Sequence, residues 1–311
     1  MKYCFFILLW FFFPFHHLMA QQGKEVTLHT PTGDIQGTLL IPQSKGKVPV
    51  ALLIAGSGPT DRNGNNPVMK NNDLKMLAEA LYKNGIASLR YDKRGIGASR
   101  QAGLTESKLR FGQYINDAKS WVDLLKQNKK FSSIVVIGHS QGSLIGMVVS
   151  QDKAVSKFVS LEGAGEPIDV VLRKQLESQP EYVKRIAFPI LDSLEAGKMV
   201  DSVPPMLNTL FRLSIQPYLM SWFRYNPQKE IAKLHKPVLL VQGTTDIQVS
   251  LTDAENLKKA DPSARLLIIK GMNHILKNAP ANRQENIRTY YLPDLPLNKE
   301  LVTGVVNFIK E

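Results

Sequence analysis

Apolar, strand-like segments alternate with amphipathic, helix-like segments along most of this chain. An extended segment is indicated at residues 33–42, and strands are indicated at residues 48–56, 86–92, 132–138, 157–163, 236–243 and 264–271. Helical spacing of apolar residues is found at residues 71–85, 111–128, 143–151, 252–260 and 299–311. Parallel strands need a long crossover between them, and this crossover is usually a helix. The sequence therefore predicts an α/β fold, with a mostly parallel central sheet and helices on both faces.

The alternation breaks between Gly165 and about Asn226. This stretch is rich in Leu, Met and aromatic residues at helical spacing, as in PPMLNTLFRLSIQPYLMSWFRYNP. It predicts a helical cap, residues 165–228, inserted into the α/β domain. The apolar stripe of this cap is compatible with packing inside the cap and with lining a pocket.

The first 20 residues have the pattern of a secretory signal peptide. A positively charged start precedes an apolar run from Cys4 to Phe15, and Ala20 is a small residue suited to cleavage. An uncleaved membrane anchor is the alternative, but the run is shorter than the about 20 residues that span a bilayer. We therefore expect an exported protein, periplasmic or secreted, with no stable membrane insertion after cleavage and an α/β domain at residues 21–311.

Charge and cysteine content exclude some classes of function. The chain has 39 Lys and Arg against 27 Asp and Glu, a formal net charge of +12. The basic residues are not gathered into one stripe, so we expect a solvated basic surface and no nucleic-acid partner. Cys4, inside the leader, is the single cysteine. The mature chain is therefore expected to have no disulfide and no thiol nucleophile.

The segment SSIVVIGHSQGSLIG, residues 132–146, ends a buried strand with a serine. Gly138 and Gly142 stand two places to either side of Ser140. Small residues at these places let the strand and the following helix approach closely, while the residue between them adopts a strained conformation and lifts its hydroxyl above the sheet. The motif therefore predicts Ser140 as a nucleophile at the N-terminus of a helix.

A serine hydroxyl needs a base to become a good nucleophile. His274 follows the predicted strand 264–271, at the carboxyl edge of the sheet where the ligand sites of such folds gather. His29 is expected before the sheet begins, His139 belongs to the turn itself, and His235 precedes a strand at the opposite edge. His274 is therefore the predicted base.

The base in turn needs a carboxylate to orient it. Asp246 follows the strand 236–243 at the same carboxyl edge, and the order Ser140, Asp246, His274 is the one expected for this fold. Asp253 is the rival carboxylate, but we expect it inside the next helix as a surface or first-turn charge.

Two backbone N–H groups aimed at one point are needed to hold an oxyanion. Gln141, the residue after the nucleophile, is expected to supply one of them. Ser57, in the loop AGSGP after the strand 48–56, is expected to supply the other, with Gly56 as the alternative. We expect neither a cofactor nor a metal in this chemistry.

Five motifs together resemble those of the α/β-hydrolase superfamily: AGSGPTDRNGN (55–65), YDKRGIGAS (91–99), GHSQG (138–142), GTTDIQV (243–249) and GMNH (271–274). The likeness covers nearly all of the mature sequence, and the subfamily is similar to exported bacterial esterases and serine-aminopeptidase-like hydrolases. The resemblance implies the α/β-hydrolase fold and hydrolysis through an acyl-enzyme intermediate. One departure is Ala55, where a histidine often precedes the oxyanion glycine.

We expect a carboxylic ester hydrolase that acts on small-molecule acyl esters, because the predicted cap is apolar. An aminopeptidase-like amide hydrolase and a thioesterase are the alternatives, and Glu162 and Glu166 are the carboxylates that would hold a substrate amine. A binding protein without chemistry is a third reading, which the complete set of Ser140, Asp246 and His274 disfavours. Substrate identity, acyl-chain preference and oligomeric state are not predicted.

Two further charged pairs lie in these motifs. Asp61 and Arg62 either contact a polar substrate group at the mouth of the site or cap a tight Asn-Gly turn, and we favour the turn. Asp92 and Arg94 are expected to brace the loop after their strand and to take no part in the chemistry.

Overall fold

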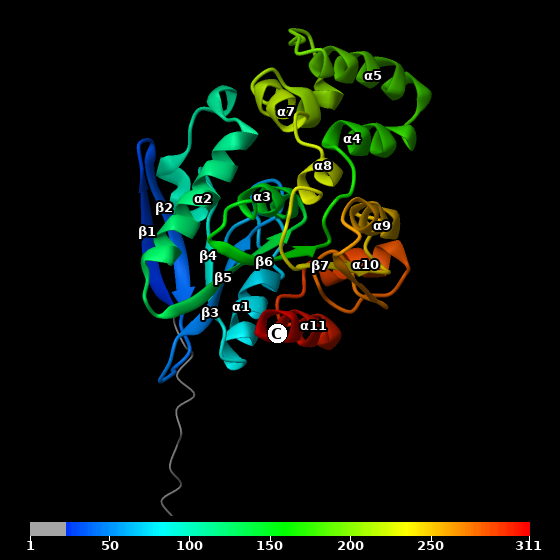
Figure 1. The fold of residues 1–311 in the computed structure, drawn as a ribbon. Coiled ribbons are helices and arrows are strands. Elements are labelled where there is room, and N and C mark those ends of the chain that lie inside the picture. Colours follow the sequence, from blue (N-terminus) through cyan, green and yellow to red (C-terminus); the bar gives the residue numbers. More distant parts are fainter. Residues whose placement is uncertain (1–22) are drawn as a thin grey trace, which may run out of the picture.

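Eight strands form one sheet in the computed structural model, which describes residues 23–311. The predicted signal peptide, residues 1–20, lies outside the described residues. The strands are β1 (Lys24–Thr30), β2 (Gly33–Leu40), β3 (Val48–Ile54), β4 (Ala87–Tyr91), β5 (Phe131–His139), β6 (Val155–Leu161), β7 (Val238–Gly243) and β8 (Arg265–Ile269). Their order across the sheet is β1-β2-β4-β3-β5-β6-β7-β8 (Figure 1).

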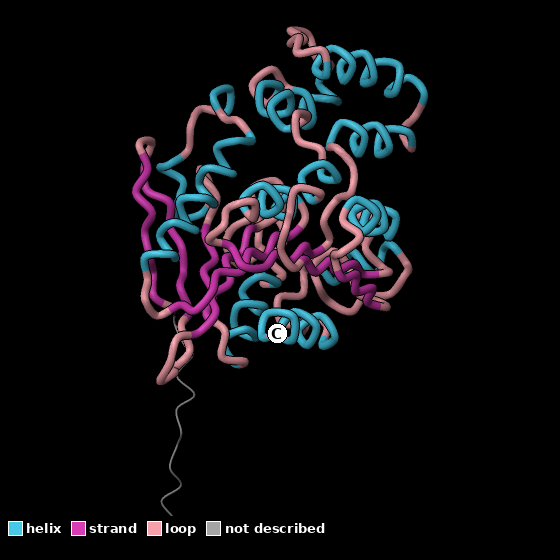
Figure 2. The backbone as a smooth tube through the Cα atoms, viewed as in Figure 1, coloured by secondary structure: helices cyan, strands magenta, loops and turns pink. Residues whose placement is uncertain are grey.

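Strands β3 to β8 pair in parallel, whereas β1 pairs with β2, and β2 with β4, in the antiparallel direction. The helices packed against the sheet or joined to it are α1 (Asp73–Lys83), α2 (Phe111–Gln127), α3 (Gln141–Val149), α9 (Leu251–Ala260), α10 (Arg283–Thr289), α11 (Lys299–Lys310) and the short η1 (Gly97–Ala102) and η2 (Glu106–Lys108). Helices lie on both faces of the sheet (Figures 1 and 2). The predicted mostly parallel sheet between two helical layers is therefore confirmed.

Neighbouring residues of the central strands pack into opposite layers. In β3, Leu52 and Ile54 join the apolar cluster shared with α2 and α3, whereas Ala51 and Leu53 join the cluster shared with α1 and α11. Successive side chains of a strand point to opposite faces, so a strand between two helical layers must be apolar on both. This packing holds the ends of β3 and β5 side by side, and the loops that follow them form the candidate site.

The expectation that the sheet begins after His29 is wrong. Strand β1 spans Lys24–Thr30, and its register with β2 places His29 opposite Asp34. The Nδ1 atom of His29 lies 2.8 Å from Oδ1 of Asp34, and both side chains are largely exposed. The sequence of β1 is polar because β1 is an edge strand, and this hides it from a search for apolar runs.

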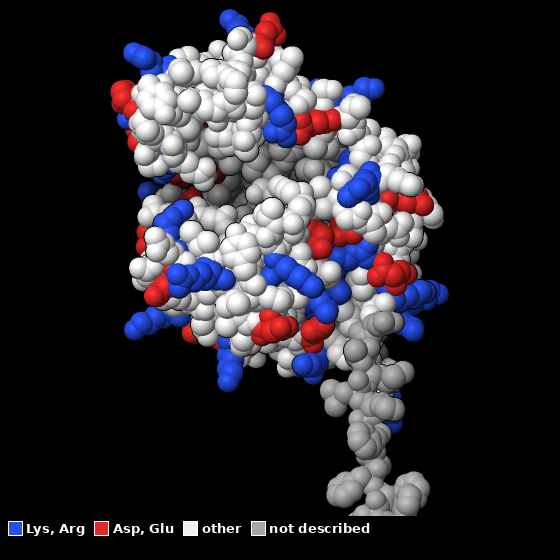
Figure 3. Space-filling model, turned by 180° about the vertical axis from the view of Figure 1, so that it is seen from behind, with Lys and Arg blue, Asp and Glu red and all other residues white. Residues whose placement is uncertain are grey.

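Five helices, called the cap helices below, lie between β6 and β7 and occupy the top of Figure 1: α4 (Ile168–Glu177), α5 (Glu181–Glu195), α6 (Asn208–Phe211), α7 (Gln216–Trp222) and α8 (Pro227–Ile231). With the short helix η3 (Pro205–Leu207) they share an apolar cluster of their own, in which Leu191 and Phe211 are fully buried. Figure 3 shows a hollow between this upper part and the rest of the molecule. No helix within residues 23–311 is long and apolar enough to cross a membrane.

Candidate active site

Ser140 lies at the tight turn between β5 and α3, with φ 54° and ψ −120°. Such a backbone conformation costs a residue with a side chain about 1–3 kcal/mol. The flanking glycines are required by packing: a Cβ on Gly138 would overlap the carbonyl group of Gly142, and a Cβ on Gly142 would overlap the carbonyl group of Ile54. The two glycines therefore allow the close approach of α3 to β3 and β5 that the sequence pattern implies.

His274 and Asp246 form a buried pair on the loops that follow β8 and β7. Nδ1 of His274 lies 2.7 Å from Oδ2 of Asp246, and the two side chains are 5% and 0% exposed. The other carboxylate oxygen, Oδ1, accepts the backbone N–H groups of Gln248 at 2.7 Å and Val249 at 3.1 Å. A carboxylate can only accept at Nδ1, so the proton of the neutral ring sits there and Nε2 is left free to accept one.

Several contacts determine the ionisation of Asp246. Burial raises the pKa of Asp246, but the imidazole of His274 and the hydrogen bonds to the carboxylate lower it by more, so that it ends well below its usual range. The carboxylate of Asp246 is therefore ionised at every pH at which the protein is expected to work.

His139 joins the turn that carries Ser140 to His274. The two histidine rings have centroids 4.9 Å apart, and Nε2 of His139 lies 2.7 Å from the carbonyl oxygen of His274. Burial lowers the pKa of His139 to about 3, so this ring is neutral and donates Nε2–H to that carbonyl. The Ser140 hydroxyl has no hydrogen bond to another residue of the described chain. The structure thus places the serine turn beside His274, while the direct Ser140–His274 hydrogen bond is not formed.

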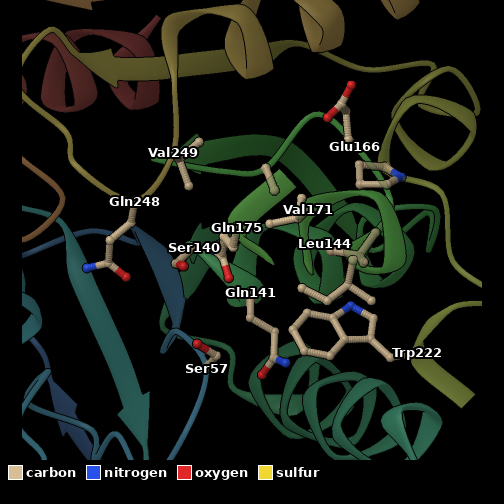
Figure 4. Close-up of a pocket in the computed structure, with 13 residues that line it drawn as sticks. Ser57, Ser140, Gln141, Leu144, Glu166, Val171, Gln175, Trp222, Gln248 and Val249 are labelled. Atoms are coloured by element: carbon tan, nitrogen blue, oxygen red, sulfur yellow. The ribbon is translucent and has the colours of Figure 1, made fainter. Parts of the chain in front are cut away.

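The two predicted oxyanion donors lie beside the serine. Ser57, Ser140 and Gln141 line the same pocket (Figure 4). The loop that carries Ser57 follows β3, the parallel neighbour of β5, and a Cβ on Gly56 would lie 3.2 Å from Cβ of Ser140. Within residues 23–311, the backbone N–H groups of Ser57 and Gln141 have no hydrogen-bond acceptor. Gln141 is the first residue of α3, where a helix leaves its N–H groups unpaired.

Lys93 is a residue of the site that sequence reasoning missed. It follows β4, its side chain is 1% exposed, and Nζ donates to the carbonyl oxygens of Gly56 and Gly58. Lysine is almost never fully buried, so the polar motif YDKRG gave no signal that this side chain turns inward.

Glu162 lies directly behind Asp246. Its side chain is fully buried, its backbone has φ 49°, and Oε1 accepts the N–H of Gly243 at 2.9 Å. Burial raises the pKa of Glu162 well above its usual range, and the negative charge of Asp246 and a hydrogen bond between the two carboxyl groups raise it further. The raised pKa favours the protonated form of Glu162, in which the carboxyl group can donate to Asp246. Glu162 is not among the residues that line the pocket, so it cannot hold a substrate amine there.

The other charged residues singled out in the sequence have structural partners. Oδ1 of Asp61 accepts the N–H groups of Asn63 at 2.8 Å and Asn65 at 2.9 Å, which is the turn-capping arrangement. Arg62 is buried and bridges Glu25 and Asp92 instead of facing the pocket.

The loop after β4 is braced as expected. Oδ1 of Asp92 accepts the N–H of Arg62 at 2.7 Å, and its Oδ2 accepts the N–H of Ala98 at 2.9 Å. Arg94 forms a buried ion pair with Asp117 at 2.5 Å.

The rival carboxylate Asp253 caps the first turn of α9 and also accepts the N–H of Gly165.

A pocket of about 110 Å³ connects the serine turn with the cap helices. Its wall combines apolar and polar side chains from both parts of the molecule: Ser57, Ser140, Gln141, Leu144, Ala164, Glu166, Ile168, Val171, Gln175, Trp222, Pro227, Gln248 and Val249 (Figure 4). Glu166 is paired with Lys174 on α4.

Lys and Arg side chains are scattered over the face seen in Figure 3, with Asp and Glu between them. In residues 23–311 no group of three or more His, Cys, Asp or Glu side chains is arranged to hold a metal ion.

Comparisons with known proteins find similar sequences and similar folds. A family model described as serine aminopeptidase, S33, matches residues 71–161. Esterase EstD of Thermotoga maritima is 26% identical over 269 residues, which is 82% of this chain and 60% of EstD. The chain therefore spans less than two thirds of the length of that curated relative.

Solved structures match over more of the chain. Est1E of Butyrivibrio proteoclasticus, determined with ferulic acid bound, has a TM-score of 0.62 at 16% identity and covers 92% of this chain and 100% of Est1E. The α/β hydrolase GrgF of a Penicillium species has a TM-score of 0.61 at 18% identity, over 92% of this chain and 97% of GrgF. The esterase Pf2001 of Pyrococcus furiosus has a TM-score of 0.59 at 20% identity, over 94% and 91%. These matches show that the chain has the α/β-hydrolase fold.

Proposed function

We propose that this protein is a serine hydrolase that cleaves small-molecule carboxylic esters through an acyl-enzyme intermediate. The observation that carries the proposal is the buried His274–Asp246 pair, which lies beside a strained serine turn and two unpaired backbone N–H groups. Similarity to EstD and Est1E supports an ester as the substrate.

In the first half of the reaction, Nε2 of His274 takes the hydroxyl proton of Ser140 as Oγ attacks the ester carbonyl carbon. Asp246 holds the ring in the required tautomer and stabilises the imidazolium that forms. The oxyanion accepts hydrogen bonds from the N–H groups of Ser57 and Gln141, and one such donor is worth about 3 kcal/mol. Catalytic hydrogen bonds are often long in a free enzyme and shorten when substrate binds, which accounts for the unformed Ser140–His274 bond.

In the second half, His274 gives its proton to the leaving alcohol and the acyl group remains on Ser140. A water molecule then loses a proton to His274 and attacks the acyl carbon. The same two N–H groups hold the second oxyanion, and the acid is released as Ser140 regains its proton. The balance of the two halves is one ester bond and one water consumed, with one alcohol and one acid formed.

Replacement of the serine tests the proposal. Ser140→Ala is expected to abolish turnover of p-nitrophenyl butyrate and labelling by a fluorophosphonate, with an unchanged thermal transition. Ser120→Ala, which replaces a half-buried serine on α2, is the matched control and is expected to retain both. Undiminished turnover in Ser140→Ala would refute the assignment.

An amide hydrolase is the second candidate, because the matching family model carries an aminopeptidase description and Glu166 lies in the pocket wall. Lys174 already pairs with Glu166, which opposes binding of a substrate amine there. Turnover of aminoacyl p-nitroanilides above that of p-nitrophenyl esters would favour this candidate over the esterase.

We also propose export of the mature domain after cleavage behind Ala20, on the pattern of residues 1–20. The N-terminal sequence of protein recovered from outside the cytoplasm is expected to begin at Gln21. A product recovered there with residues 1–20 intact would contradict cleavage.

A further inference from the structure

Lys93 holds the loop that carries the proposed oxyanion donor Ser57. Its ammonium group donates to the carbonyl oxygen of Gly56 and, at 3.1 Å, to the carbonyl oxygen of Gly58. The two carbonyl groups flank Ser57 on either side. Lys93 belongs to the loop after β4, and Gly56 to the loop after β3, so this contact joins two loops that follow adjacent parallel strands.

The geometry of the peptide bond gives this contact a consequence for the oxyanion site. The carbonyl group of Gly56 and the N–H group of Ser57 belong to the same peptide unit, which is planar and trans, so they point in opposite directions. A side chain that binds the carbonyl oxygen therefore sets the direction of the N–H. Lys93 lies buried on one side of this peptide, and the pocket that Ser57 shares with Ser140 is open to solvent.

We propose that Lys93 is a positioning residue, which binds the carbonyl oxygen of Gly56 and thereby directs the Ser57 N–H toward the oxyanion formed at Ser140. This inference rests on the proposed function. The second bond, to the carbonyl oxygen of Gly58, holds the Gly58–Pro59 peptide on the other side of Ser57, so that the loop is held at two points. Lys93 makes no contact with substrate in this role.

The surroundings of Lys93 agree with an anchoring role. No carboxylate of the described residues lies within ion-pair distance of Nζ, which instead lies 5.5 Å from the ring centroid of Tyr114. Burial lowers the pKa of Lys93 to about 7. A neutral amine still has two N–H bonds for two carbonyl oxygens, so the anchor persists on both sides of this pKa.

If the Gly56–Ser57 peptide were free to rotate, stabilisation of the transition state would be weakened more than binding of the substrate. The oxyanion exists only after Ser140 attacks, so loss of a well-aimed donor lowers kcat and leaves KM nearly unchanged. A lysine that merely supports the loop would change thermal stability without this selective effect on kcat.

The test is Lys93→Met, which keeps the length and apolar stem of the side chain and removes its donors. Lys236→Met is the matched control, because Nζ of Lys236 also bridges two backbone carbonyl groups, those of Asp152 and Val155, before the start of β7. For Lys93→Met we expect kcat for p-nitrophenyl butyrate to fall at least about tenfold, with KM within twofold, since loss of a complete donor costs about 10²–10³-fold. Lys236→Met is expected to keep the kcat of the wild type.

Two further measurements complete the test. The affinity for a butyl boronic acid, whose serine adduct is tetrahedral, is expected to fall with kcat in Lys93→Met. A crystal structure of this variant is expected to show the Gly56–Ser57 peptide rotated, with the Ser57 N–H turned from Ser140. Lys93→Gln is measured in parallel, so that a folding failure of one variant leaves the test in place, and the same selective loss of smaller size is expected.

The outcomes separate this inference from the proposed function. Turnover that persists in Ser140→Ala would end the proposed function, and the orientation of the Gly56–Ser57 peptide in the crystal would still test the anchor. A wild-type kcat and an unrotated peptide in Lys93→Met would overturn the inference while the function stands. Equal losses of kcat in the Lys93 and Lys236 variants would also overturn it, since the effect would then be general.

Discussion

Nδ1 of His274 donates to Oδ2 of Asp246 across 2.7 Å, and neither side chain is open to solvent. The two residues are 28 positions apart in the chain and follow adjacent parallel strands, β7 and β8. The carboxyl ends of parallel strands meet at one edge of the sheet, so residues that follow them become neighbours in space. Removal of either partner would leave the other buried without its counterpart.

Asp246→Asn is expected to lower kcat for p-nitrophenyl butyrate by about 10³–10⁴-fold. The amide can donate to Nδ1, which places the ring proton on Nε2 and removes the base that the proposed mechanism requires for Ser140. The residual rate and the melting temperature measure the effect. Asp253→Asn, on the first turn of α9, is the control and is expected to keep kcat within about twofold. An Asp246→Asn variant with the activity of the wild type would contradict the assignment of the carboxylate.

The free energy of unfolding of Glu162→Gln, taken relative to that of the wild type, is expected to increase as the pH rises. The pKa of Glu162 in the folded protein is raised, so its contribution to stability is complete below the unfolded pKa of about 4.3 and is lost as pH rises through the folded value. Glutamine keeps a donor for Asp246 and cannot ionise, so this loss disappears. Urea unfolding of both proteins at pH 5 and pH 8 checks the result. A difference in unfolding free energy that does not change with pH would count against a raised pKa.

Gly142→Ala is expected to destabilise the protein by at least about 2 kcal/mol, because the added methyl group would overlap the carbonyl groups of Ile54 and Ala55 at the end of β3. Gly46→Ala is the matched control, since nothing lies within 4 Å of a Cβ at that position. Urea denaturation compares the two variants. If Gly142→Ala unfolds at the same urea concentration as Gly46→Ala, the close approach of α3 to β3 is not needed.

Val171→Ala is expected to shift the preference of the enzyme toward longer acyl chains. Val171, on α4, lines the pocket of about 110 Å³ above Ser140, and removal of two methyl groups enlarges it. The ratio of kcat/KM for p-nitrophenyl octanoate over acetate is expected to rise about tenfold, the effect of a small change in an apolar pocket. Val170→Ala, next to it on the same helix and not part of the pocket wall, is the control. An equal rise in both variants would mean that the cap does not select the acyl chain.

Local sequence patterns were enough for the architecture and for the serine turn. Alternating apolar strands and amphipathic helices predicted the parallel sheet, because each element buries its own periodic face. Gly138 and Gly142 marked Ser140, since only residues without a side chain allow the approach of strand and helix. His274 and Asp246 were found by the edge of the sheet that they follow, and the structure brings them together.

Other features depend on partners that are distant in the sequence, and no local pattern contains them. Strand β1 is polar because it lies at an edge, so the expectation that His29 precedes the sheet was wrong. Arg62 faces Glu25 and Asp92 instead of the pocket, and Glu162 lies buried behind Asp246 instead of beside a substrate amine. In each case the sequence shows a charged residue in a loop, and only its three-dimensional neighbours decide its protonation and orientation.

The sequence by itself determined which residues follow the strands. The runs of apolar residues that identify each strand also show where it ends. Tertiary structure alone decided that Lys93 turns inward to the loop of Ser57, since the two carbonyl groups that it binds lie 37 and 35 positions earlier in the chain. An ammonium group is buried only where oxygen atoms replace its water, and folding of the sheet is what brings those oxygen atoms to it.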